Sequence, residues 1–151
     1  MVFPGGWPLT DYKTKAKSIY AQAIKINDQG NYFPILGVCQ GFSFLNEFAA
    51  SAGEDILNKS LGLQVPISVA ITLTNDPSET KMFKEAGSLA KRFETVDFAY
   101  NVHGQGVKPG SFETDAGLKE MFKLTSTCHD PNKNIDFACS MESEKYPFVG
   151  L

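Results

Sequence analysis

The first half of the chain alternates between helical and strand-like hydrophobic patterns. From Thr10 or the next residue, a suitable N-cap, apolar side chains recur every three or four positions, which predicts an amphipathic helix that ends near Gly30. Residues 32–38 are apolar without alternation, as expected for a strand buried on both faces of a parallel sheet. A second helical pattern follows Cys39 and ends at Gly53. The order predicted is therefore strand, tight turn at Cys39, helix.

The second half favours alternating strands and short helices. Period-two alternation predicts strands over 65–72 and 96–103, the second of which ends at His103 before a glycine-rich turn. The remaining predicted elements are a strand ending before Pro4, short helices at 78–87 and 115–122, hairpin strands at 123–128 and 135–141, and an entering strand at 146–151. This succession predicts one α/β domain over residues 1–151 with a mostly parallel central sheet.

Composition and charge narrow the partner classes. The chain has 151 residues, 42% hydrophobic and 21% charged, which is enough for a single globular core. The net charge is −3 without long runs, so the sequence favours neither a nucleic-acid groove nor a polybasic membrane patch. No apolar run reaches the roughly 18 residues of a membrane span, and residues 1–6 lack a signal-peptide pattern. A small-molecule or peptide-like partner fits best.

The three cysteines do not have the spacing of a zinc or redox site. Cys128 and Cys139 are predicted to flank a hairpin turn centred on Pro131. With that turn, Cys128 faces about residue 135, and Cys139 lies on the order of 13 Å further along the ladder. We therefore expect both to be buried, unpaired thiols.

Cys39 is the candidate nucleophile. Gly37-x-Cys39-x-Gly41 is the thiol version of the nucleophile elbow, in which glycines give the backbone room for a sharp strand-to-helix turn. The N-terminus of the following helix favours a thiolate, and the N–H group of Gln40 is then aimed at a developing oxyanion. A core cysteine in a tight turn would show the same short pattern. The buried strand before it and the amphipathic helix after it favour the nucleophile.

Two further features gain meaning beside the elbow. Pro4-Gly5-Gly6 is by itself most simply a turn, but beside a nucleophile elbow it becomes a candidate second oxyanion donor. Of the two histidines, His103 is the one that could plausibly act as a general base for Cys39, although a substrate-orienting or structural role is favoured for it. His129 lies in a turn-like segment and is most simply a solvated side chain.

Longer motifs resemble the gamma-glutamyl hydrolase family. The similarity spans essentially all 151 residues and is carried by Phe3-Pro4-Gly5-Gly6, Asp11-Tyr12, residues 31–42 around the elbow, Tyr100-Asn101-Val102-His103, and the segments Met141-Glu142 and 145–150. This combination is far more specific than the elbow alone.

The resemblance implies a three-layer, flavodoxin-like fold of the class I glutamine amidotransferase type. It implies cleavage of gamma-glutamyl bonds in folate poly-gamma-glutamates through a thioester on Cys39, with Gly6 and Gln40 as oxyanion donors. Gly5 and His103 would lie in the substrate pocket. No metal or other cofactor is implied. A homodimer and a lysosomal, vacuolar or extracellular location are implied for intact relatives.

The chain also departs from the family pattern. In the family, the general base belongs to a histidine-proline-glutamate motif a few residues beyond the position of Leu151, and a strand, a helix and a second strand precede the position of Phe3. We therefore expect a fragment truncated at both ends, with doubtful activity. Two alternatives stay open: a catalytically inactive binding protein and a glutamine amidotransferase subunit. Against the amidotransferase, Phe42 stands where many such enzymes carry histidine.

Overall fold

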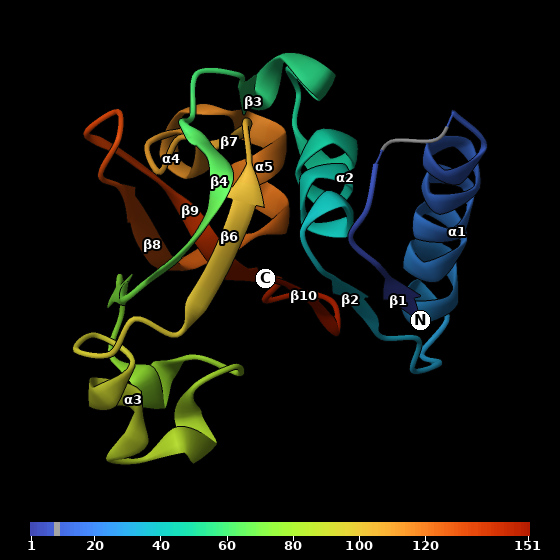
Figure 1. The fold of residues 1–151 in the computed structure, drawn as a ribbon. Coiled ribbons are helices and arrows are strands. Elements are labelled where there is room, and N and C mark those ends of the chain that lie inside the picture. Colours follow the sequence, from blue (N-terminus) through green and yellow to red (C-terminus); the bar gives the residue numbers. More distant parts are fainter. Residues whose placement is uncertain (8–9) are drawn as a thin grey trace.

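The computed structural model describes residues 1–7 and 10–151 (Figure 1). Its helices are α1 (Thr10–Asp28), α2 (Gln40–Ala49), α3 (Leu89–Arg92), α4 (Ser111–Thr114) and α5 (Ala116–Met121), with the 3₁₀ turns η1 (Gly53–Ile56), η2 (Pro77–Glu79) and η3 (Lys84–Ala86). Its strands are β1 (Val2–Phe3), β2 (Ile35–Gly37), β3 (Leu57–Asn58), β4 (Leu63–Val69), β5 (Ile71–Leu73), β6 (Ala99–His103), β7 (Gly106–Val107), β8 (Lys123–Asp130), β9 (Ile135–Glu142) and β10 (Phe148–Gly150).

The main sheet is mixed. Within the described residues its strand order is β1-β2-β10-β9-β8-β5. β2 runs parallel to both β1 and β10, whereas the β10–β9, β9–β8 and β8–β5 pairs are antiparallel. The α/β class predicted from the sequence is therefore confirmed, but this sheet is not mostly parallel. The reason is that the β8–β9 hairpin and the short connection to β10 can only make antiparallel neighbours.

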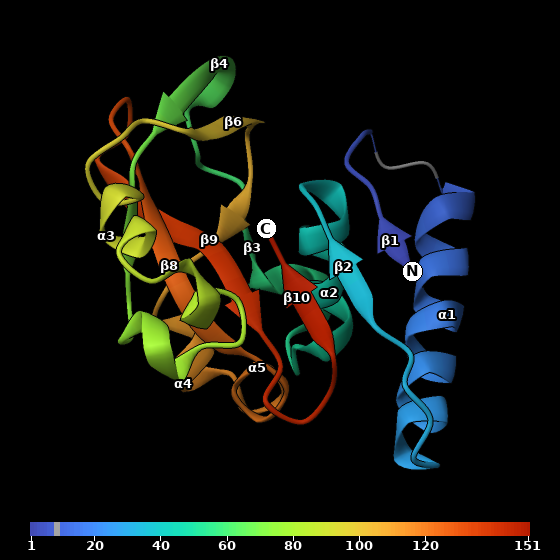
Figure 2. The ribbon, with the colours of Figure 1, turned by 90° about the horizontal axis from the view of Figure 1, so that it is seen from below.

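Helices α1 and α2 lie side by side next to the parallel strands (Figures 1 and 2). The helical spacing in α1 buries Ala16, Tyr20 and Ala23, and these residues belong to the same core cluster as Phe44 and Leu45 of α2. The Phe44 ring also packs edge-on against Tyr12, with 5.0 Å between ring centroids. This core fixes α2, and hence the turn before it, against the sheet.

A second apolar cluster supports the other half of the molecule. It contains Leu61, Leu63, Ile71, Phe83, Cys128 and Phe137. Over this cluster β4 and β6 form a two-stranded antiparallel ribbon, and Figures 1 and 2 both show β6 passing beside the C-terminal end of the chain. The ribbon is irregular, because Leu63 pairs with His103 while Ile67 pairs with Asn101.

The helix predicted over 78–87 is wrong: the segment forms the separate turns η2 and η3. Backbone N–H groups that a helix would use are taken by side chains. Lys81 and Met82 both donate to the buried Glu142 carboxylate, at 2.9 Å each, and Phe83 donates to the Thr80 hydroxyl at 3.0 Å. Gly87 ends the segment at φ 53°. Such competing bonds to side chains explain why the helical spacing of apolar residues does not produce a helix here.

The prediction for Cys128 and Cys139 is also wrong, because the two form a disulfide. The hairpin turn is longer than expected and closes with Asp130 opposite Ile135, so Cys128 faces Phe137 rather than residue 135. A bulge follows, since Thr127 pairs with Ala138 and Ser126 with Ser140. Cys139 is the extra residue of this bulge, and its Cα atom lies 5.4 Å from that of Cys128.

Candidate active site

Cys39 forms the turn between β2 and α2. Its backbone has φ 53° and ψ −106°, a combination that side-chain-bearing residues rarely adopt. The thiol is free and exposed. The predicted strand–cysteine–helix order is therefore confirmed, and the strained conformation is that of a nucleophile elbow.

The two glycines of the elbow are required by close backbone approach. A Cβ atom on Gly37 would lie 2.6 Å from a methyl group of Leu45 and 2.7 Å from the Gly41 carbonyl oxygen. A Cβ atom on Gly41 would collide with the carbonyl group of Phe3. Both glycines therefore give the backbone room, as predicted. The glycine spacing alone does not reveal that Gly41 also makes room for β1.

The Pro4-Gly5-Gly6 turn lies directly against Cys39. A Cβ atom on Gly5 would be 3.0 Å from the Cys39 Cβ and 3.4 Å from its Sγ. Gly6 has φ 143°, a region that favours glycine. The structure therefore brings the turn and the cysteine together, with Gly5 closest to the sulfur.

Tyr12 holds this turn, a role that the helical spacing alone does not reveal. Its hydroxyl donates to the Pro4 carbonyl oxygen at 2.9 Å. Burial raises the pKa of Tyr12, and its electrostatic interaction with Cys39 raises it further. The sequence carried a signal, because Tyr12 falls in the first turn of the helix that follows the glycines.

The carboxyl ends of the three parallel strands meet at this site. The Cys39 N–H group donates to the Leu151 carbonyl oxygen at 2.9 Å, just after β10, and Val38 N–H donates to the Phe3 carbonyl oxygen at 2.9 Å, at the end of β1. Gln40 is the first residue of α2, so its N–H group lies outside the intrahelical hydrogen-bond ladder. Ligands of open α/β sheets bind at this kind of edge.

His103 is half-buried at the end of β6 and is held by both ring nitrogens. Nδ1 lies 2.7 Å from the Gln105 carbonyl oxygen and Nε2 lies 3.0 Å from the Asn101 Oδ1 atom. Burial lowers the pKa of His103, and the Gln105 carbonyl and Asp130 partly offset this. Both ring nitrogens thus face oxygen atoms of the neighbouring residues 101 and 105, which hold the ring in place. This favours an orienting or structural role over that of a replacement base.

The other histidine lies apart from these groups. His129 is exposed near the end of β8 and pairs across the hairpin with Asp136, at 2.8 Å from Nδ1 to Oδ1. It is solvated as predicted, although it belongs to a strand rather than a turn. In the part of the chain that the structure describes, histidine, cysteine and acidic side chains form no cluster of three or more that could hold a metal ion.

The structure is that of an α/β protein with a free cysteine at a strained strand-to-helix turn, backed by a glycine turn at the same sheet edge, which is the backbone geometry typical of a nucleophile elbow. The chain is similar over its whole length to curated gamma-glutamyl hydrolases. It is 26% identical over 152 residues to gamma-glutamyl hydrolase 1 of Arabidopsis thaliana, 28% over 155 residues to the Homo sapiens enzyme, and 23% over 158 residues to gamma-glutamyl hydrolase B of Dictyostelium discoideum.

These alignments cover 100% of this chain but only 43%, 47% and 44% of the respective relatives. The chain thus spans less than half the length of the relatives it matches. No protein-family model matches it. The resemblance inferred from the motifs is confirmed by these alignments.

Proposed function

We propose that this chain carries the nucleophilic part of a gamma-glutamyl hydrolase that cleaves gamma-glutamyl bonds of folate poly-gamma-glutamates. The observation that carries the proposal is the elbow itself: Cys39 is exposed at φ 53°, with Gly5 against its sulfur. The relatives named gamma-glutamyl hydrolase support the gamma-glutamyl bond as the target, and the family resemblance implies the folate poly-gamma-glutamates.

In the proposed reaction, the Cys39 thiolate attacks the carbonyl carbon of the gamma-glutamyl amide. The tetrahedral oxyanion is stabilised by the N–H groups of Gly6 and Gln40, and its collapse releases the amine as the thioester forms. Water then cleaves the thioester and restores the thiol. Gly5 lines the pocket beside the sulfur, and His103 contributes to substrate binding.

Proton transfer in this reaction requires a general base. The family resemblance assigns this role to a histidine that follows the position of Leu151. The Leu151 carbonyl accepts the Cys39 N–H bond, so residues that continue from β10 would emerge beside the nucleophile. General-base catalysis contributes roughly 10²–10⁴-fold to such reactions, so the activity proposed here belongs to the protein that contains that histidine.

The broader proposals follow the same resemblance. We propose a flavodoxin-like, three-layer arrangement and a homodimer for the whole protein. We propose a lysosomal, vacuolar or extracellular location, and the Cys128–Cys139 disulfide supports it because disulfides form in the oxidising ER lumen through which such proteins pass. Within the residues described, no helix has the length and apolar character needed to cross a membrane.

The test is hydrolysis of a folate poly-gamma-glutamate by the full-length protein and its Cys39→Ala variant. We expect glutamate release and a mass-detectable acyl adduct for the wild type, and loss of both for the variant. An alpha-linked glutamate peptide serves as the matched control substrate and should not be cleaved. An alanine variant that keeps its rate would exclude Cys39 as the nucleophile. A wild type that binds the substrate without cleaving it would favour an inactive binding protein.

A further inference from the structure

The hydrogen bonds around His103 specify its protonation state. The Gln105 carbonyl oxygen, 2.7 Å from Nδ1, can only accept, so Nδ1 must carry a hydrogen. At the other nitrogen, Nε2 faces the Oδ1 atom of Asn101 at 3.0 Å. An amide oxygen also only accepts. Both contacts are therefore satisfied together only when both ring nitrogens are protonated.

The orientation of the Asn101 amide is fixed independently. Its Nδ2 group donates to the Ala99 carbonyl oxygen at 2.8 Å. Exchanging the amide oxygen and nitrogen would place two oxygens in that contact and would remove the bond. Asn101 is also buried, so water does not readily replace a lost partner. The acceptor that faces Nε2 is thus held in place by β6 itself.

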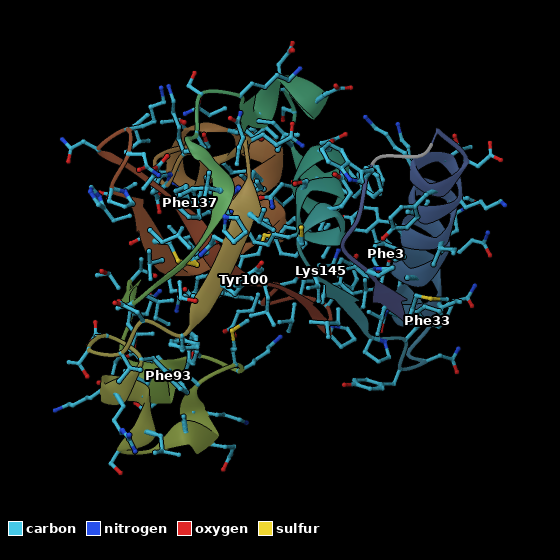
Figure 3. All side chains as sticks on the ribbon, viewed as in Figure 1. Phe3, Phe33, Phe93, Tyr100, Phe137 and Lys145 are labelled. Carbon is cyan, nitrogen blue, oxygen red and sulfur yellow. A yellow bond between two sulfur atoms is a disulfide. The ribbon has the colours of Figure 1, made fainter. Side chains whose placement is uncertain are left out.

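Neutral side chains make up most of the surroundings of the ring, and Asp130 contributes a negative charge. Its edge packs on Phe137 of β9, with 5.2 Å between ring centroids, and Figure 3 labels Phe137 next to the β4–β6 ribbon. On the paired strand β4, Leu63 and Gln64 are neutral. Among the described residues, the charged group that acts on His103 is Asp130, at the end of β8. Asp130 is itself buried and accepts the Gly62 N–H bond at 2.6 Å.

We propose that Asn101, His103 and Gln105 form a proton-operated latch, in which Asn101 is a positioning residue. When the imidazole binds a second proton, Nε2–H donates to Asn101 within β6, while Nδ1–H donates to Gln105 in the turn that follows. When the ring releases that proton, two lone pairs face each other at the Asn101 contact and this bond within β6 is lost, while the Gln105 bond stays. The latch does not depend on the reaction proposed for Cys39.

The latch operates in mildly acidic solution. Burial lowers the pKa of His103 below the usual value of about 6.5, against the smaller raising effects of Gln105 and Asp130. Because the pKa is lowered, the second proton is bound only as the pH falls below that usual range. The ring is neutral, and the Asn101 contact open, above it.

Two-dimensional NMR of the protein labelled with ¹⁵N-histidine tests the latch, because the imidazole nitrogen shifts distinguish imidazolium from each neutral tautomer. On acidification we expect both His103 nitrogens to become protonated. On deprotonation we expect the neutral form to carry its hydrogen on Nδ1, as the Gln105 carbonyl dictates. His129 is exposed and serves as the internal control in the same spectra.

Variants of Asn101 test whether the Asn101 contact, and not only burial, affects the titration of His103. Asn101→Asp places a carboxylate beside Nε2 and should raise the His103 titration midpoint by about one pH unit or more, while Asn101→Ala should lower it. A neutral His103 with its hydrogen on Nε2, or a midpoint unaffected by Asn101→Asp in a folded variant, would overturn the proposal. The tautomer measurement on the wild type decides the question if a variant fails to fold.

Discussion

Cys39 combines a free, exposed thiol with a strained backbone. Its φ of 53° with ψ of −106° costs a residue with a side chain of the order of 1–3 kcal/mol, whereas glycine adopts such angles readily. The surrounding contacts hold the conformation: Cys39 N–H bonds to Leu151, and its carbonyl accepts from Ser43 N–H at 3.1 Å. Strain that persists under such restraint points to function rather than to stability.

The strain predicts an unusual ranking of substitutions at position 39. Cys39→Gly should be more stable than Cys39→Ala by about 1 kcal/mol, because relief of strain exceeds the roughly 0.5–1 kcal/mol entropic disadvantage of glycine. Urea denaturation of both variants measures the difference. Ala50→Gly is the matched control, since Ala50 has φ −65° and glycine should there lower the stability. Equal stability of the two position-39 variants would show that the turn relaxes without cost.

At the scale of elements, β1, β2 and α2 approach one another closely through glycines. The bond from Val38 to the Phe3 carbonyl and the contact of Gly41 with the same carbonyl join the ends of β1 and β2 to the first turn of α2. Tyr12 adds α1 to this junction through the Pro4 carbonyl. Cys39 and the glycine turn are therefore positioned by backbone contacts between neighbouring elements.

Gly41→Ala should disrupt this junction. The added methyl group collides with main-chain atoms of Phe3 that cannot move without shifting β1, so we expect a loss of about 1–3 kcal/mol or more. Gly110→Ala is the control: no atom lies within 4 Å of its added Cβ and its φ is −60°, so its stability should change by less than about 0.5 kcal/mol. Thermal unfolding compares the two. A Gly41→Ala variant as stable as Gly110→Ala would contradict the packing described here.

At the scale of the whole molecule, the β8–β9 hairpin connects the two apolar clusters. Phe137 and Cys128 belong to the cluster under the β4–β6 ribbon, while Ala138 and Met141 belong to the cluster under α2. The Cys128–Cys139 disulfide crosses this hairpin. Stability of the hairpin therefore affects both halves.

Reduction of the disulfide should destabilise the protein by about 3 kcal/mol, because the closed loop spans a sequence separation of 11 residues. Urea unfolding with and without reductant measures the loss. The double variant Cys128→Ala with Cys139→Ala is the control, and its stability should not respond to reductant. Thiol titration of the denatured, unreduced protein should detect only Cys39, and three free thiols would refute the disulfide.

Local patterns were sufficient for the elements around the nucleophile. The three-four spacing after Thr10 and after Cys39 gave α1 and α2, and the unalternating run before Cys39 gave β2, because burial of one helical face or of a whole strand leaves its mark in consecutive residues. The glycine spacing likewise gave the elbow, since few other residues fit so sharp a turn.

Tertiary structure alone decided what depends on register and on partners distant in sequence. A two-residue difference in hairpin pairing and one bulge turned two expected free thiols into a disulfide. Residues 78–87 form two turns instead of the predicted helix, because side-chain acceptors such as Glu142 bind their backbone N–H groups. The sequence placed His103 at a strand end, but only its neighbours show that both ring nitrogens are engaged. Local sequence specifies backbone preferences, whereas hydrogen-bond partners across the chain are settled only when the elements pack.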